Sequence, residues 1–222
     1  MISAVIYVII CIVYILQFVW ALYLFIKNPS YHLLLFLILI FGLFYDGFIL
    51  SIGNLVGAGA FLLFISWFRF LFHVLLTPIC IIVVYELGVD HEIFLGKKLD
   101  IKTQRIIIWM MFVAFLLLGL FTHYIGIEIG ISEFDDGLLR YTQLDGGPPI
   151  ATILVSIVVL ILSIQFGRKT NWKVPWLLIG IMVMIIGAMI PSSKYGTAYG
   201  SFVEMILALS MLVVYHINYK KF

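Results

Sequence analysis

The chain has 222 residues, of which 64% are hydrophobic and only 11% carry a charge, with a net charge of +2. This composition excludes a soluble domain, because soluble domains carry about a quarter charged residues. It predicts an integral membrane protein whose apolar side chains face lipid, all-α in fold class, with membrane lipids and no nucleic acid among its partners.

Seven apolar runs approach the length of about 20 residues that crosses a hydrocarbon core about 30 Å thick. The first has no basic leader and no cleavage site, so we expect it to remain as a membrane helix. In chain order the predicted spans are residues 4–26, 33–51, 67–87, 106–126, 149–166, 175–190 and 201–218. We expect one transmembrane domain over residues 1–222, a polytopic bundle of seven helices.

Two features interrupt this pattern. The short, glycine-rich stretch 52–66 fits a surface-lying or re-entrant piece, or an early start of the third helix. Pro78 lies inside the third run, and a proline there predicts a kink. Cys11 and Cys80 both lie in apolar runs, which indicates packing rather than a disulfide framework or a redox motif.

The basic residues predict the orientation, because Lys and Arg are retained on the cytoplasmic side. With the N-terminus outside and the C-terminus cytoplasmic, only Arg140 and Lys194 lie in outer loops. Ten others lie in inner segments: Lys27, Lys97, Lys98, Lys102, Arg105, Arg168, Lys169, Lys173, Lys220 and Lys221. We therefore predict a multi-pass protein of a cell membrane with this orientation.

Five ionisable side chains from four different spans lie at a similar predicted depth, in the outer half of the membrane: Asp46, Arg69, His73, His123 and Glu204. Arg69 and His73 are four residues apart and share one helix face. Each charge costs several kcal/mol in lipid unless it is paired or faces water, so such residues are functional candidates. The purely structural alternative is an Asp46–Arg69 pair that fixes helix packing.

The same residues are compatible with several kinds of chemistry. His73, His123, Asp46 and Glu204 are candidates for general acid and base catalysis, and also for binding a divalent metal such as zinc. Arg69 is a candidate anion clamp for a head group, with Trp67, Tyr195 and Tyr199 as further substrate contacts or as residues of the interfacial aromatic belt. A haem held by His73 and His123 is a further alternative.

Seven spans with an outer N-terminus resemble the microbial rhodopsins, but those carry a retinal-binding lysine in the last helix and residues 201–218 contain none. The architecture is also similar to that of intramembrane hydrolases of the adiponectin-receptor and alkaline-ceramidase type. Those enzymes carry an HxxxH pair in the last helix, whereas His216 stands alone here. The resemblance covers architecture only and assigns no family.

These features predict an outward-facing polar pocket and, as the first hypothesis, an intramembrane enzyme acting on an amphiphilic, lipid-like substrate. One alternative is a small proton- or ion-coupled transporter, against which stands the lack of an inverted repeat. The other is a non-catalytic assembly, immunity or receptor-like protein.

The predicted orientation is tested by cysteine labelling in a variant without Cys11 and Cys80. A cysteine introduced at Gly137 should react with an impermeant maleimide in intact cells, because it lies in the predicted outer loop. A cysteine at Thr170 should react only after permeabilisation. The reverse labelling pattern would contradict the predicted orientation.

Overall fold

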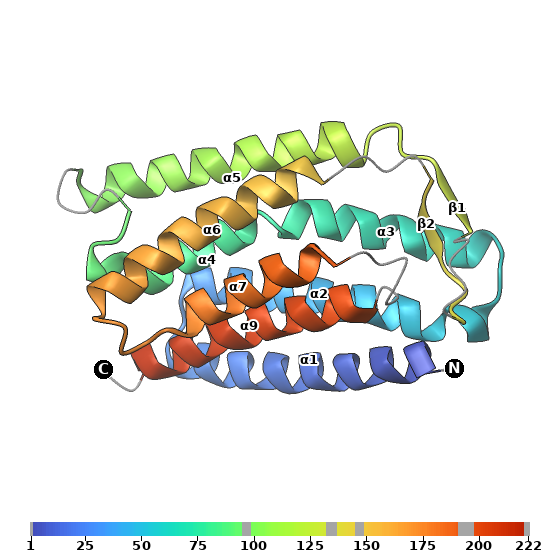
Figure 1. The fold of residues 1–222 in the computed structure, drawn as a ribbon, viewed down its shortest axis with the longest axis horizontal. Helices are drawn as coiled ribbons and strands as arrows, with labels where there is room; N and C mark the ends of the chain where they lie inside the picture. The colour runs from blue at the N-terminus through green and yellow to red at the C-terminus, as the bar shows by residue number, and fades with distance from the viewer. Residues whose placement is uncertain (1, 95–98, 132–136, 145–148, 191–197, 220–222) are drawn as a thin grey trace.

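Long apolar helices lie side by side along one axis, with the two termini at opposite ends of the bundle (Figure 1). The computed structural model describes residues 2–94, 99–131, 137–144, 149–190 and 198–219. Its elements are α1 (Ile2–Lys27), α2 (Tyr31–Val56), α3 (Ala60–Leu76), α4 (Ile79–Gly88), the 3₁₀ turn η1 (Val89–His91), α5 (Ile101–His123), β1 (Ile129–Ile131), β2 (Tyr141–Gln143), α6 (Ile150–Lys169), α7 (Trp176–Ala188) and α9 (Ala198–Tyr219).

Within the described ranges, six helical segments are long and apolar enough to cross a membrane. They are α1, α2, the stretch Ala60–His91 that contains α3 and α4, α5, α6 and α9. This confirms the helical, membrane-embedded class. The predicted sixth span corresponds to α7, whose 13 residues rise only about 20 Å. The count of seven spans therefore stays a prediction.

The stretch between the second and third spans is resolved in favour of an early start. Helix α2 continues to Val56, and α3 begins at Ala60 rather than at Trp67. The turn between them contains Gly57 at a φ of 78°, a conformation that costs glycine little. A re-entrant or surface-lying piece is therefore wrong for these residues.

The predicted kink at Pro78 is confirmed, since α3 ends at Leu76 and α4 begins at Ile79. All ten residues of α4 are buried. The helix packs against α2, α5, α6 and α9, so it forms the centre of the bundle. In lipid such packing is stabilised by van der Waals contact rather than by the exclusion of water.

The loop after α5 contains a short antiparallel hairpin that the sequence pattern did not predict, in which Ile129 of β1 pairs with Gln143 of β2. The side chain of Asn54, near the end of α2, fixes this loop. Its Nδ2 donates to the Gly137 carbonyl at 2.6 Å, and its Oδ1 accepts from the backbone N–H of Leu139 at 2.5 Å. A Cβ on Gly53 would lie 1.9 Å from the Leu139 carbonyl oxygen, so only glycine permits this approach.

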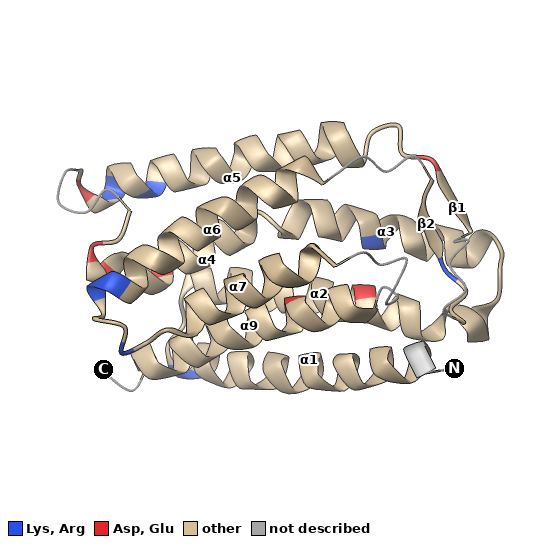
Figure 2. Ribbon diagram, viewed as in Figure 1, with Lys and Arg blue, Asp and Glu red and all other residues tan. Residues whose placement is uncertain are grey.

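Lys and Arg gather mainly at the end of the bundle where the C-terminus lies, while the middle stretches of the helices carry few charges (Figure 2). This distribution agrees with the asymmetry from which the orientation was predicted. The orientation in the membrane itself stays a prediction.

Candidate functional site

A polar cavity of about 390 Å³ lies toward the hairpin end of the bundle, and all five of the ionisable residues singled out from the sequence line it. Asp46 comes from α2, Arg69 and His73 from α3, His123 from α5 and Glu204 from α9. Their predicted convergence is confirmed, although they are far apart in the chain. Their chemical roles stay predictions.

The side chains from α3 lie farther along their helix than the sequence suggested. Because α3 begins at Ala60, Arg69 is about 14 Å and His73 about 20 Å along the helix from its first residue. His123 is the last residue of α5, and the helix that was expected to run to residue 126 ends there. The hairpin contributes Gln143 to the cavity wall.

Asp46 and Arg69 form an ion pair across α2 and α3, with 3.0 Å between Arg69 Nε and Asp46 Oδ1. Only 11% of the Arg69 side chain and 27% of the Asp46 side chain are exposed. The guanidinium also lies 4.7 Å from the centre of the Phe70 ring. The ion pair that the structural alternative requires is therefore present. Each group compensates the charge of the other. Arg69 Nη1 is buried and has no hydrogen-bond partner in the part of the chain that the structure describes.

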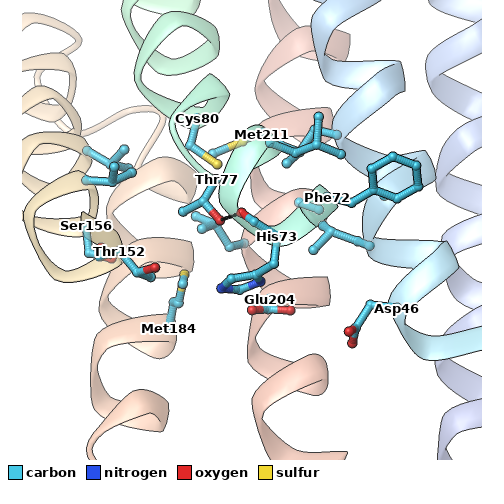
Figure 3. Close-up of a pocket in the computed structure, with 18 of the residues that line it drawn as sticks. Asp46, Phe72, His73, Thr77, Cys80, Thr152, Ser156, Met184, Glu204 and Met211 are labelled. Atoms are coloured by element: carbon cyan, nitrogen blue, oxygen red, sulfur yellow. Dashed lines mark hydrogen bonds between the residues drawn. The ribbon is translucent and has the colours of Figure 1, made fainter. Parts of the chain in front are cut away.

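His73 and Glu204 also line the cavity, but neither side chain has a hydrogen-bond or ion-pair partner among the described residues. Figure 3 shows the His73 ring pointing toward the Glu204 carboxylate, with the Asp46 carboxylate to one side. The backbone carbonyl of His73 accepts from Thr77 Oγ1 at 2.5 Å, which keeps this turn closed just before the kink. An unpaired histidine and an unpaired carboxylate thus face the same space.

His123 is the third group with spare hydrogen-bonding capacity. Its Nε2 is buried and has no partner in the described structure. Buried polar atoms are nearly always hydrogen-bonded in native proteins, to water or ligand if not to protein. The wall of the cavity therefore holds more hydrogen-bonding capacity than the protein itself uses.

A second, apolar chamber of about 60 Å³ adjoins the polar cavity and continues toward the centre of the bundle. The two share part of their wall, including Asp46, Arg69, His73 and Glu204. Beyond these groups the chamber is lined mainly by apolar residues, among them Leu43, Phe72, Leu76, Met184, Leu207 and Met211. Together the two spaces form a site that is polar at one end and apolar at the other.

Two residues predicted to contact a substrate, Trp67 and Tyr199, do not line this site. Trp67 packs edge-on against Tyr124, with ring centres 5.8 Å apart, and does not line either space. Tyr199 is not part of either lining, although Gly200 beside it is. Tyr195 lies outside the described residues. An aromatic residue near a helix end is a weak indication of substrate binding, because packing at the membrane interface favours the same position.

The metal hypothesis finds no support in the described part of the chain, where no three His, Cys, Asp or Glu side chains are placed to hold a metal ion. The candidates share a cavity but not a coordination sphere. Zinc needs about four ligands within about 2.0 to 2.3 Å, a far tighter arrangement than shared lining. The haem alternative stays a prediction.

A second polar cluster, at the opposite end of the bundle, was missed by the sequence reasoning. Arg105 Nε and Nη2 each lie 2.8 Å from an oxygen of Glu86, whose side chain is only 2% exposed. Tyr31 donates to the same carboxylate. Glu86 was not singled out from the sequence, and Arg105 was used only as a basic residue of an inner segment. The available signal was the uninterrupted apolar run before Glu86, which indicates burial.

The Asp46–Arg69 pair should be important for stability. Asp46→Asn should lower the free energy of unfolding by about 3 to 5 kcal/mol, since it leaves a buried guanidinium uncompensated. Replacing both residues by Leu should restore much of the loss. Chemical unfolding in detergent measures both effects.

The matched control is the ion pair between Glu92 and Lys169, whose side chains are 47% and 48% exposed. Glu92→Gln should change stability by less than about 1 kcal/mol, as expected for exposed pairs. A cost of the same size for Glu92→Gln and Asp46→Asn would contradict the role assigned to burial.

Comparisons of this chain with protein-family models, with curated proteins and with solved structures found no match. What the cavity binds therefore has to be inferred from its own residues.

Proposed function

We propose that this integral membrane protein admits an amphiphilic, lipid-like molecule to the cavity and acts on its head group as an intramembrane enzyme. The observation that carries this proposal is the junction of a polar cavity with an apolar chamber inside one bundle. Ligand sites are typically apolar clefts with a few converging polar groups. Here the polar groups would receive the head and the chamber would receive the chain.

His73 is the residue we propose to transfer a proton to or from the head group. Its side chain faces the cavity and pairs with none of the described residues, so a substrate group can reach the ring. Glu204 lies beside the His73 ring in the same space (Figure 3) and would orient the head or accept a proton. The Asp46–Arg69 pair would hold α2 and α3 in place, and His123 would supply a further hydrogen bond.

The proposed route of entry is from the outer leaflet of a cell membrane. The cavity is lined by Tyr7, near the start of α1, and by Gln143 of the hairpin. Most Lys and Arg residues lie at the other end of the bundle (Figure 2). With the N-terminus outside, the end that holds the cavity faces the outer leaflet. Membrane lipids are therefore the proposed source of the substrate.

A proton- or ion-coupled transporter is a second candidate, favoured by one observation. Another polar cavity, of about 240 Å³, lies at the opposite end and is lined by His32, Glu86 and Arg105 among others. Helix α4 connects the two regions, because Cys80 near its start lines the apolar chamber and Glu86 near its end lines the second cavity. Polar sites at both ends are what a path across the membrane requires.

His73→Gln tests the proposed enzyme. The change removes proton transfer but keeps a polar side chain, so turnover of a membrane lipid extract should fall about 10²- to 10⁴-fold. Thermal stability in detergent should change by less than about 1 kcal/mol, because the His73 ring makes no hydrogen bond or ion pair with any of the described residues. Mass spectrometry of the lipids measures the turnover.

The control is His216→Gln at the other end of the bundle, where the ring packs edge-on against Trp20. This variant should keep full turnover. An enzyme works in open detergent micelles, whereas a transporter shows activity only as flux across closed vesicles. A stable His73→Gln protein with unchanged turnover would falsify the catalytic assignment.

A further inference from the structure

The charges on the cavity wall do not balance. Among the described residues that line it, two carboxylates, Asp46 and Glu204, accompany a single guanidinium, that of Arg69. Arg69 is already bound to Asp46 at 3.0 Å. The wall also holds two histidines, His73 and His123. Among the described residues, Glu204 therefore has no compensating cation, and it lies inside an apolar bundle.

An uncompensated carboxylate in such a place selects among head groups. Burying it ionised costs several kcal/mol, and a cation brought beside it removes much of that cost. A phosphate or carboxylate head would instead be repelled by Glu204, and the charge of Arg69 is already compensated by Asp46. The electrostatics of the wall thus favour a positively charged head group over a negatively charged one.

The size of the apolar chamber limits the apolar part of the ligand. The chamber is small, about 60 Å³, and it begins at the groups that line both spaces, Glu204 among them. Figure 3 shows Glu204 and His73 on one side of this pocket and Met211 and Cys80 on the other. A small apolar space that starts beside Glu204 has room for the first methylene groups of one chain attached to the head group, not for two chains.

We propose that the ligand of this cavity is a single-chain amphiphile with a positively charged amine head, and that Glu204 is the counter-ion of that amine. The proposal rests on the proposed function, since it requires that the cavity admits an amphiphile at all. It assigns Arg69 to the structural pair with Asp46 rather than to an anion clamp.

The test uses three probes that share one chain: dodecylamine, dodecyl phosphate and dodecanol. The full-length protein in a detergent with an uncharged head is titrated with each at pH 7, where the amine is protonated. Native mass spectrometry counts the bound probe. Dodecylamine should bind roughly 10-fold or more tightly than dodecyl phosphate, and Glu204→Gln should remove most of that preference while leaving dodecanol binding within about 2-fold.

Two further variants distinguish the loss of the Glu204 charge from a general disturbance of the fold. Glu204→Asp keeps the carboxylate and should keep the preference for the amine. Glu128→Gln makes the same neutralising change outside the cavity and should have no effect. Tighter binding of the phosphate, or unchanged amine binding in Glu204→Gln, overturns the proposal but leaves the amphiphile site intact. Failure of all three probes to bind overturns the proposed function itself.

Discussion

The ion pair between Asp46 and Arg69 is the interaction on which the arrangement of this site depends. In an apolar bundle an ionised side chain is stable only beside a partner, so the pair fixes how α2 and α3 face each other. That register also places His73, one helical turn after Arg69, on the same wall. Without the pair, the groups on α3 would lose the constraint that directs them into the cavity rather than toward lipid.

The break between α3 and α4 provides the space that this wall encloses. Pro78 has no N–H to continue the helical hydrogen bonds, so the chain bends where a straight helix would pack against its neighbours. Thr77 and Pro78 both line the polar cavity, and Thr77 also lines the apolar chamber. Below the break every residue of α4 is buried, and Cys80 of this helix lines the apolar chamber. The break therefore lies where the polar cavity meets the apolar chamber.

The sequence predicted the helical membrane class and the five converging residues, because hydropathy and charge are local properties that lipid constrains strongly. It did not determine where α3 begins, since the glycine-rich stretch before Trp67 suits a loop as well as a helix. The hairpin was missed because its strands are three residues each and the segment between them is held by Asn54, a contact far away in the sequence. Glu86 was underestimated because its partner Arg105 lies on another helix.

The two polar clusters show how structural and functional roles can be separated in such a bundle. Glu86 receives two hydrogen bonds from Arg105 and one from Tyr31, so its charge is fully compensated within the protein. Glu204 has no such partner among the described residues. A fully satisfied buried network stabilises one packing, whereas an unsatisfied group lowers stability unless something else binds it. The cost of leaving Glu204 and His73 unpaired is consistent with selection for a ligand, because packing alone would favour apolar side chains at both positions.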